Sequence, residues 1–253
     1  MSTSRTPALA AVFVALTIAA AAQTSAAEDE RTPGMELIQP VMDRPILAHV
    51  IFNQLEGRWN GTNSEFKWDG QGWVGTDYDK LWIKSEGTLQ GNGTLDDGQH
   101  QFLDDRAITT YFDLQGGLRS DIDSHPTRNW AAFGIQGLAP YFFDLELTGY
   151  ASGEGHLAAK LEASYDLLIT QRLILQPEIE LNLYSKADRA RLVGAGFSDI
   201  DTGLRLRYEF SRKFAPYLGV VYEGRFGQSA SYARRLGEST GDFRLAFGVR
   251  LWF

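Results

Sequence analysis

Apolar and polar residues alternate along most of the chain with a period of two. Residues 242–253 show the pattern plainly. Their apolar positions are Phe243, Leu245, Phe247, Val249, Leu251 and Phe253, and the positions between them are Asp242, Arg244, Ala246, Gly248, Arg250 and Trp252. Residues 157–167 and 173–184 repeat it, with mainly apolar residues on one face and mainly polar residues on the other. Successive side chains of a strand point to opposite faces, so the pattern predicts β-strands.

The length and spacing of these strands indicate a barrel in a membrane. The predicted strands are residues 50–59, 64–73, 78–88, 99–108, 112–121, 128–138, 142–151, 156–168, 172–184, 200–210, 214–226 and 242–253. They run to about 10 residues, the length with which a tilted strand crosses a bilayer. Connections after the even-numbered strands are short, and most of the others are longer, as in bacterial outer-membrane barrels. We therefore predict an all-β fold, a transmembrane antiparallel up-and-down β-barrel of about 12 strands.

The N-terminus has a different pattern. An apolar run, residues 8–22, follows Arg5, and the small residues 25–27 precede an acidic stretch. This is the build of a cleaved secretory signal peptide, which we expect at residues 1–27. Residues 28–48 carry three prolines and no clear period, so we expect a flexible periplasmic segment there. Residues 49–253 are then expected to form the barrel, in contact with outer-membrane lipid.

Composition excludes several classes of function. The chain has 24 Lys and Arg against 32 Asp and Glu, a formal net charge of −8, and no basic stripe, so we expect no nucleic-acid partner. The absence of cysteine excludes disulfides, thiolate zinc sites and cysteine nucleophiles. Beyond the signal peptide no apolar run is long enough for a membrane helix. An exported chain of this kind can still enter a membrane as a closed β-barrel.

The polar face of the predicted strands carries both signs of charge. Its acidic residues are Glu65, Asp69, Glu86, Asp113, Asp144, Glu146, Glu162, Asp166, Glu178, Glu180, Glu209 and Glu223, and its basic residues are Lys67, Lys80, Lys84, Arg119, Lys160, Arg205, Arg207, Arg225, Arg244 and Arg250. In a barrel narrower than a porin, such charges favour an ion-pair network across the lumen. The alternative is a path for a small cation. Two acid pairs that lie two strands apart would suit it, namely Glu178/Glu180 and Asp144/Glu146.

A hydrolytic barrel is a weaker alternative. Such an enzyme needs a histidine that activates a serine or a water. None of the four histidines lies in a His-x-Ser arrangement that would place both groups on one strand face. We therefore expect that the chain is not an enzyme.

Several segments resemble the copper resistance protein B family. They are NQLEGRW (53–59), WDGQGWVG (68–75), KLWIKSEG (80–87), WAAFGIQGLAPYFFDLE (130–146), YDLLITQRLILQPEIELNLY (165–184), GLRLRYEFSRKFAPYLGV (203–220) and GVRLWF (248–253). The resemblance covers nearly all of residues 42–253. It implies an outer-membrane barrel that acts in copper tolerance, binding copper ions and sequestering or exporting them from the periplasm. It also implies a periplasmic multicopper oxidase beside it, so a docking barrel that conducts nothing is the alternative.

The same resemblance directs attention to soft metal ligands. Family members commonly carry a long Met- and His-rich segment before the barrel, whose thioether and imidazole groups suit Cu(I). In this chain only Met35, Met42 and His49 remain of it, and VMDRP (41–45) resembles the family's Met-x-Asp-x-Pro start of the first strand. We expect these three residues to bind a copper ion on the periplasmic side.

The other three histidines are expected at the outer end of the barrel, on or beside long loops. They are His100, His125 and His156. Of these, His100 is a further candidate copper ligand. Ligands at both ends would suit capture within the periplasm and release outside.

Overall fold

The computed structural model describes residues 45–122, 127–189 and 191–253. The expected signal peptide, residues 1–27, lies outside this part of the chain. So do His125 and nearly all of the expected periplasmic segment, including Met35 and Met42.

The described residues form strands and two short helices. The strands are β1 (Leu47–Trp59), β2 (Ser64–Gly75), β3 (Asp79–Gln90), β4 (Leu95–Ala107), β5 (Phe112–Asp121), β6 (Arg128–Ala139), β7 (Phe143–Ser152), β8 (Leu157–Tyr165), β9 (Leu167–Leu168), β10 (Leu173–Tyr184), β11 (Gly196–Tyr208), β12 (Phe214–Arg225) and β13 (Gly241–Trp252). The helices are η1 (Pro140–Phe142), a 3₁₀-helix, and α2 (Gly227–Leu236). Neither helix is long and apolar enough to cross a bilayer.

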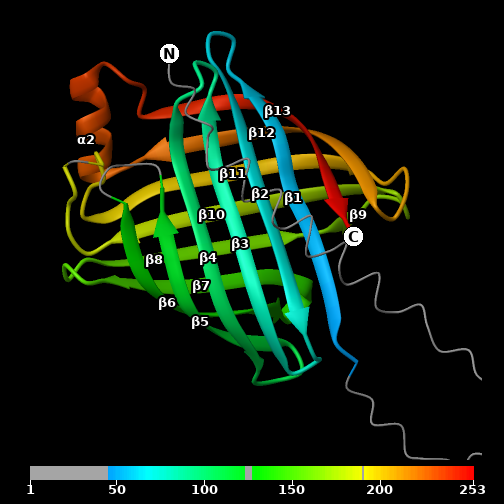
Figure 1. Cartoon of the computed structure of the whole chain (residues 1–253). Helices are drawn as coiled ribbons and strands as arrows, with labels where there is room; N and C mark the ends of the chain where they lie inside the picture. Colours follow the sequence, from blue (N-terminus) through cyan, green and yellow to red (C-terminus); the bar gives the residue numbers. More distant parts are fainter. Residues whose placement is uncertain (1–44, 123–126, 190) are drawn as a thin grey trace, which may run out of the picture.

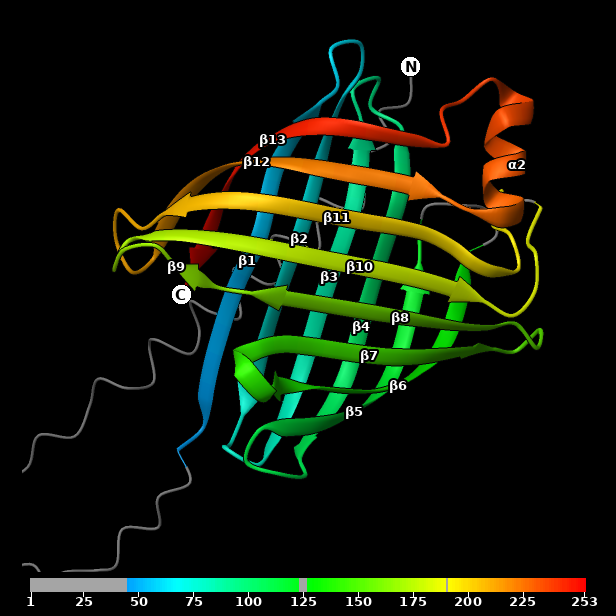
Figure 2. The same cartoon turned by 180° about the vertical axis from the view of Figure 1, so that it is seen from behind.

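The strands close into one antiparallel barrel (Figure 1, Figure 2). Closure comes from the pairing of β13 with β1. The two-residue β9 pairs with β10, as β8 does, so β8 and β9 act as one strand and twelve strands surround the lumen. A closed barrel leaves no unpaired strand edge, which is the condition for placing strands in lipid. The prediction of an all-β, antiparallel barrel of about 12 strands is confirmed.

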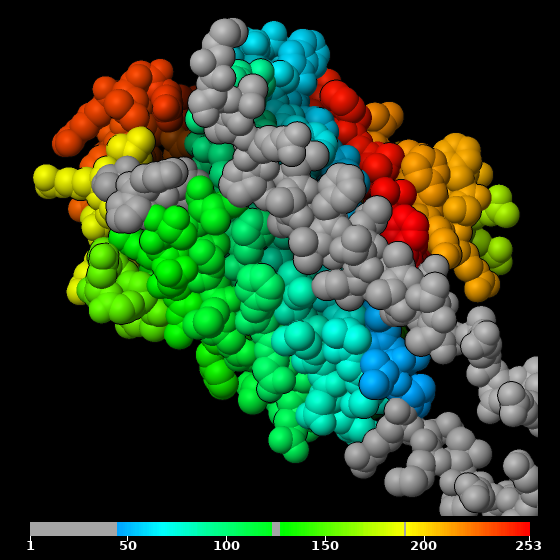
Figure 3. All heavy atoms as spheres, in the orientation of Figure 1, coloured from blue at the N-terminus to red at the C-terminus, as the bar shows by residue number. Residues whose placement is uncertain are grey.

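The two ends of the barrel differ. The end that we call the short-turn end consists of residues 76–78, 108–111, 140–142, 169–172 and 209–213. The opposite end, the long-loop end, carries the connections 185–195 and 226–240. The second contains α2 (Figure 1), and its atoms are the orange-red group at the upper left of Figure 3. Exposed aromatic residues gather at the short-turn end, namely Tyr78, Tyr111, Tyr141, Phe142 and Phe214. Aromatic girdles of this kind lie at membrane interfaces in transmembrane barrels.

One expected long loop is a tight turn. The predicted strands leave residues 89–98 as a long connection, but β3 continues to Gln90 and β4 begins at Leu95. Asn92 and Gly93 make the turn: the Gly93 N–H donates to the Gln90 carbonyl at 2.8 Å, and Gly93 has a φ of 84°. Glycine adopts this left-handed conformation without a steric penalty, so the strands can extend to both sides of the turn.

Helix α2 was not predicted, because its segment is rich in Ser and Gly, a composition that is typical of loops. Ala230 and Ala233, three residues apart, are buried on one face of the helix. The hydroxyl of Ser229 accepts a hydrogen bond from the Gly194 N–H at 2.7 Å, which ties the helix to the loop before β11. The helix ends at Gly237, whose φ of 77° is typical of a helix C-terminus.

The two faces of the wall have opposite chemistry. Large apolar side chains are exposed on the outer face, as at Leu118, Phe133, Leu218 and Phe247. The buried side chains are instead largely polar or charged, and include Arg58, Glu56 and Arg205. A soluble protein has the opposite arrangement, with an apolar interior and a polar surface. Apolar outer residues and polar interior residues are expected of a barrel whose outside faces lipid and whose lumen is polar.

Removal of Phe253 is expected to lower the yield of folded barrel several-fold. The Phe253 N–H donates to the Val50 carbonyl at 2.8 Å, and the Val50 N–H donates to the Phe253 carbonyl at 3.2 Å. Deletion therefore removes the last pair of hydrogen bonds in the seam between β13 and β1, each worth about 1 kcal/mol. Heat-modifiable, folded protein in outer-membrane fractions is the measurement. Phe253→Leu keeps both bonds and serves as the control, and equal yields for deletion and control would contradict the prediction.

Candidate cation site in the barrel lumen

Six carboxylates form a continuous row across the lumenal wall. The members of this carboxylate row are Glu146, Glu162, Glu180, Asp201, Glu223 and Asp242, one each on β7, β8, β10, β11, β12 and β13. Every member lies directly opposite the next one in the strand register. Side chains in such positions have their Cβ atoms about 5 Å apart, and like charges there destabilise a sheet. The row therefore requires cations between its members.

The row climbs from one end of the barrel to the other. Glu146 lies three residues from the short-turn end of β7, which begins at Phe143. Asp242 lies one residue from the long-loop end of β13, which begins at Gly241. The row crosses tilted strands at right angles, so successive carboxylates lie farther along the barrel axis. It therefore connects the two ends of the lumen.

Basic side chains of the same lumen lie between the carboxylates. The Lys84 Nζ is 2.7 Å from a Glu146 oxygen, and the Lys160 Nζ is 2.5 Å from Glu162 and 3.5 Å from Glu180. Farther along, the Lys67 Nζ is 2.8 Å from Asp201. Arg58 bridges Asp201 and Glu223, and Arg244 lies 3.3 Å from Glu223. In the described residues Asp242 has a hydrogen bond from the Asn60 side chain but no ion pair.

A second cluster, centred on Glu56, holds the wall near β1 and β11. Glu56 is completely buried and accepts hydrogen bonds from Arg205 at 2.9 and 3.0 Å, from Arg58 at 2.6 Å and from the Tyr217 hydroxyl at 3.0 Å. Arg58 also contacts the carboxylate row, so Glu56 fixes the guanidinium that bridges Asp201 and Glu223. Buried charges of this kind stay ionised only when they are paired and hydrogen-bonded.

The lumen contains a wide cavity that opens at the short-turn end. This cavity, which we call the vestibule, has a volume of about 460 Å³ and reaches Thr110 and Tyr111 in a short turn. Its charged lining residues are Asp69, Asp113, Asp144, Glu146, Glu162, Glu178, Arg205 and Arg250. Carboxylates therefore outnumber guanidinium groups by three to one, and such a cleft concentrates cations.

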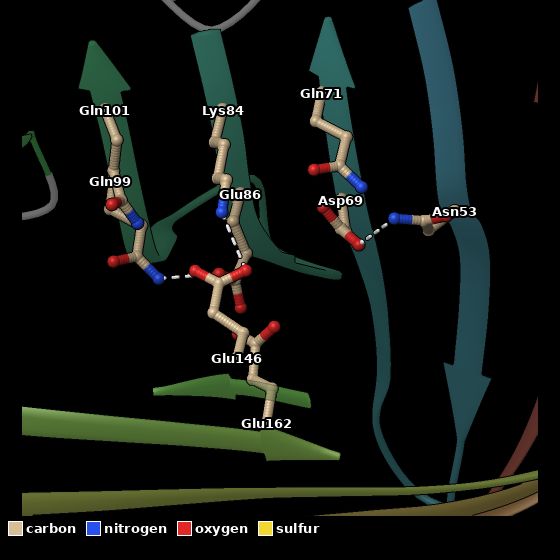
Figure 4. A pocket seen from close by; sticks show the side chains of 9 residues that line it. All are labelled: Asn53, Asp69, Gln71, Lys84, Glu86, Gln99, Gln101, Glu146 and Glu162. Atoms are coloured by element: carbon tan, nitrogen blue, oxygen red, sulfur yellow. Dashed lines mark hydrogen bonds and ion pairs between the residues drawn. The ribbon is translucent and has the colours of Figure 1, made fainter. Parts of the chain in front are cut away.

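A smaller cavity lies beside the vestibule (Figure 4). This inner cavity has a volume of about 50 Å³. Its lining residues are Asn53, Asp69, Gln71, Lys84, Glu86, Gln99, Gln101, Glu146 and Glu162. Glu146 and Glu162, the first two members of the carboxylate row, reach it from one wall, and the other residues reach it from β1 to β4 on the opposite wall.

The predicted soft ligands are separated in the structure. His49 lies in β1 near the short-turn end, two residues before Ile51, which lines the vestibule. Its ring is 6.2 Å from the Trp73 ring. The location expected for His100 is wrong: it lies inside β4, between Gln99 and Gln101, which line the inner cavity, so its side chain points to the outer face. The structure therefore does not bring His49 and His100 together.

The sequence located part of this site. It placed Glu146 and Glu180 close together two strands apart, and the structure confirms this with Glu162 between them. It missed Glu56 and Arg58, because a β-bulge between Phe52 and Gln54 reverses the alternation of β1. The alternation of Leu55 and Gly57 with Glu56 and Arg58 was the available signal.

Comparison with known proteins identifies the family. The family described as copper resistance protein B precursor (CopB) matches residues 46–253. The chain belongs to the copper resistance protein B family. Copper resistance protein B of Escherichia coli is 41% identical over 213 residues, which make up 84% of this chain and 72% of that protein. A copper resistance protein B homolog of Pseudomonas syringae pv. tomato is 42% identical over 213 residues, with the same shares of the two chains.

A solved structure shares the fold. The NanC porin superposes with a TM-score of 0.54 at 12% identity, covering 81% of this chain and 99% of the porin. At this identity the likeness shows the fold alone. The closed barrel and its copper resistance protein B relatives locate the chain in the bacterial outer membrane, where it has a role in copper resistance. Outer-membrane barrels keep their short turns in the periplasm, so the vestibule faces the periplasm.

Proposed function

We propose that this barrel binds copper ions that enter its vestibule from the periplasm and exports them along the carboxylate row. The observation that carries the proposal is the row itself: six carboxylates in register, leading from the vestibule at Glu146 to the outer end at Asp242. Directly opposed carboxylates repel one another, so a fold that needed only stability would not retain six of them in succession.

The ligands of the carboxylate row suit an ion that binds briefly at each site and moves on. Its oxygen ligands bind Cu(II) without the thiolate or imidazole groups that would hold it tightly. The Lys84, Lys160 and Lys67 ammonium groups already contact the carboxylates, so an arriving ion competes with them for the same oxygens. Weak, repeated sites of this kind favour movement over storage.

The test is copper flux into liposomes that contain the purified barrel. Asp242→Asn removes one charge of the row and leaves no basic residue without its described partner, since Asp242 has no ion pair in the described residues. We expect this variant to lower the rate of Cu(II) flux, and Glu180→Gln to lower it further, up to about 10-fold. Glu238→Gln, which alters an exposed carboxylate in the 226–240 loop, is the control. Equal flux in all four proteins would refute a path along the row.

Capture of Cu(I) is proposed at the periplasmic mouth. Met35 and Met42 offer thioethers and His49 an imidazole, a soft set that favours Cu(I) over zinc or calcium. His49 lies on the face of β1 that lines the vestibule, which supports a Cu(I) site at the entrance to the lumen, separate from the path for Cu(II) along the row.

Replacement of Met35, Met42 and His49 by alanine is expected to weaken Cu(I) binding about 10-fold or more. Folding is expected to be unaffected, and heat-modifiability of the purified variant checks this. Cu(I) titration of the purified protein is the measurement, and His100→Ala is the matched control. Unchanged Cu(I) affinity in the triple variant would remove the proposed capture site and leave the carboxylate row untouched.

A barrel that docks a periplasmic multicopper oxidase and conducts nothing would give a different result. It would protect cells from copper, yet liposomes containing it would show no more flux than empty ones. The flux experiment thus separates the two functions before any partner is identified.

A further inference from the structure

The inner cavity differs from the rest of the carboxylate row. Here Glu146 and Glu162 of the row face Asp69 and Glu86 on the opposite wall, so carboxylates converge from both sides (Figure 4). One oxygen each of Glu86, Glu162 and Glu180 lies within 4.8 Å of the other two, and the Lys160 Nζ contacts the three carboxylates at 2.6, 2.5 and 3.5 Å. Glu180 does not line the inner cavity, so the carboxylates that a cation there would meet are Asp69, Glu86, Glu146 and Glu162.

Two buried glutamine side chains add amide oxygens to the same cavity. Gln99 and Gln101 line the inner cavity and are only 3% and 4% exposed. Their Nε2 groups donate to Glu86 at 2.7 Å and to the Tyr150 hydroxyl at 3.3 Å. Their Oε1 atoms have no hydrogen-bond partner among the described residues. A buried polar atom without a partner costs about 1–3 kcal/mol, and a bound cation would remove that cost.

The charges around the inner cavity do not balance. Asp69, Glu86, Glu146 and Glu162 contribute four carboxylates to its lining. Lys84 is the lining ammonium. From outside the lining, Lys160 contacts Glu86 at 2.6 Å and Glu162 at 2.5 Å, and the Lys67 Nζ is 4.0 Å from Glu86. Asp69 has a hydrogen bond from Asn53 at 3.1 Å but no ion pair among the described residues. The lining itself therefore has four carboxylates and one ammonium, an excess of negative charge that a divalent ion would reduce.

We propose that the inner cavity binds one divalent cation through carboxylate and amide oxygens, an ion of the calcium, magnesium or manganese class. All its acceptor groups are hard oxygen ligands, and its described lining residues include no thioether or imidazole for Cu(I). A volume of about 50 Å³ has room for one ion and a water. The bound ion would join the two walls of the lumen. This site does not depend on copper transport, and its test uses no copper.

The test is titration of the purified full-length barrel with Mn²⁺ after treatment with a chelator. Loss of the EPR signal of free Mn²⁺ measures binding, and Ca²⁺ is added as a competitor. We expect one Mn²⁺ per barrel, displaced by Ca²⁺. Asp69→Asn should weaken binding about 10-fold or more, because it removes a charged ligand and leaves no lysine unpaired.

Three further variants separate ligand loss from structural damage. Asp113→Asn alters a vestibule carboxylate that does not line the inner cavity, so it should leave Mn²⁺ affinity unchanged. Gln101→Leu removes a proposed ligand without changing the charge and should weaken binding. Lys84→Met should tighten binding, since the ammonium that competes for Glu146 is lost.

Absence of a stoichiometric Mn²⁺ site in the wild-type protein would overturn the proposal. Equal affinities for Asp69→Asn and Asp113→Asn, or weaker binding in Lys84→Met, would overturn it as well. Copper flux along the row can be present or absent in any of these cases, so the two proposals fail independently.

Discussion

Glu56→Leu is expected to destabilise the barrel by about 3–5 kcal/mol, the usual cost of breaking a buried ion pair from one side. Glu56 is completely buried, and it accepts hydrogen bonds from both Arg58 and Arg205. Leucine would leave the two guanidinium groups close together without the carboxylate that lies between them. Arg58 still contacts Asp201, and Arg205 still contacts Glu178 at 3.2 Å. The loss of stability should therefore be large, but the barrel should not unfold completely.

Urea unfolding of the barrel in lipid vesicles measures this cost. Glu154→Leu is the matched control, because Glu154 makes an exposed ion pair with Arg128 at 3.5 Å and its side chain is 72% exposed. Surface pairs contribute about 0–1 kcal/mol, so the control should be close to the wild type. Similar free energies of unfolding for the two variants would show that the Glu56 cluster does not hold the wall.

The fold was predictable because membrane strands carry a simple signal. Each strand of the barrel needs an apolar face for lipid and a polar face for the lumen, so β13 can be recognised from residues 242–253 alone. The predicted bounds of most strands lie within three residues of the observed ones. Helix α2 was missed because its apolar residues, Ala230 and Ala233, are small and few.

The carboxylate row could be predicted only in part. Alternation placed Glu162, Glu180 and Glu223 on the lumenal face, but the prediction missed Asp201 and Asp242. Alternation also does not tell which residue of one strand lies opposite which residue of the next. That register depends on turn lengths and bulges, such as the irregularity between Asn182 and Leu183 in β10. The inner cavity lies between two walls whose residues are far apart in the sequence. No local sequence pattern therefore predicts the cavity.

The register also allows a test of which face meets lipid. Leu204 and Leu206 lie on β11 with their side chains 48% and 42% exposed on the outer face. Leu204 is four residues from the periplasmic end of β11 at Tyr208, and Leu206 is two residues from it. Their cross-strand partners on β12 are Val220 and Leu218, both exposed on the same face.

Leu204→Arg is expected to destabilise the barrel by about 2–4 kcal/mol, and Leu206→Arg by less, because the cost of an arginine facing lipid falls to about 0–1 kcal/mol near the interface. The two variants share the strand, the face and the substitution, so they differ only in depth. An arginine at position 206 can extend its guanidinium to the periplasmic interface, whereas one at position 204 has farther to reach. Urea unfolding in vesicles of two acyl-chain lengths is the measurement. The difference between the variants should grow in the thicker bilayer. Equal costs in both vesicles would mean that this part of β11 does not face the hydrocarbon core.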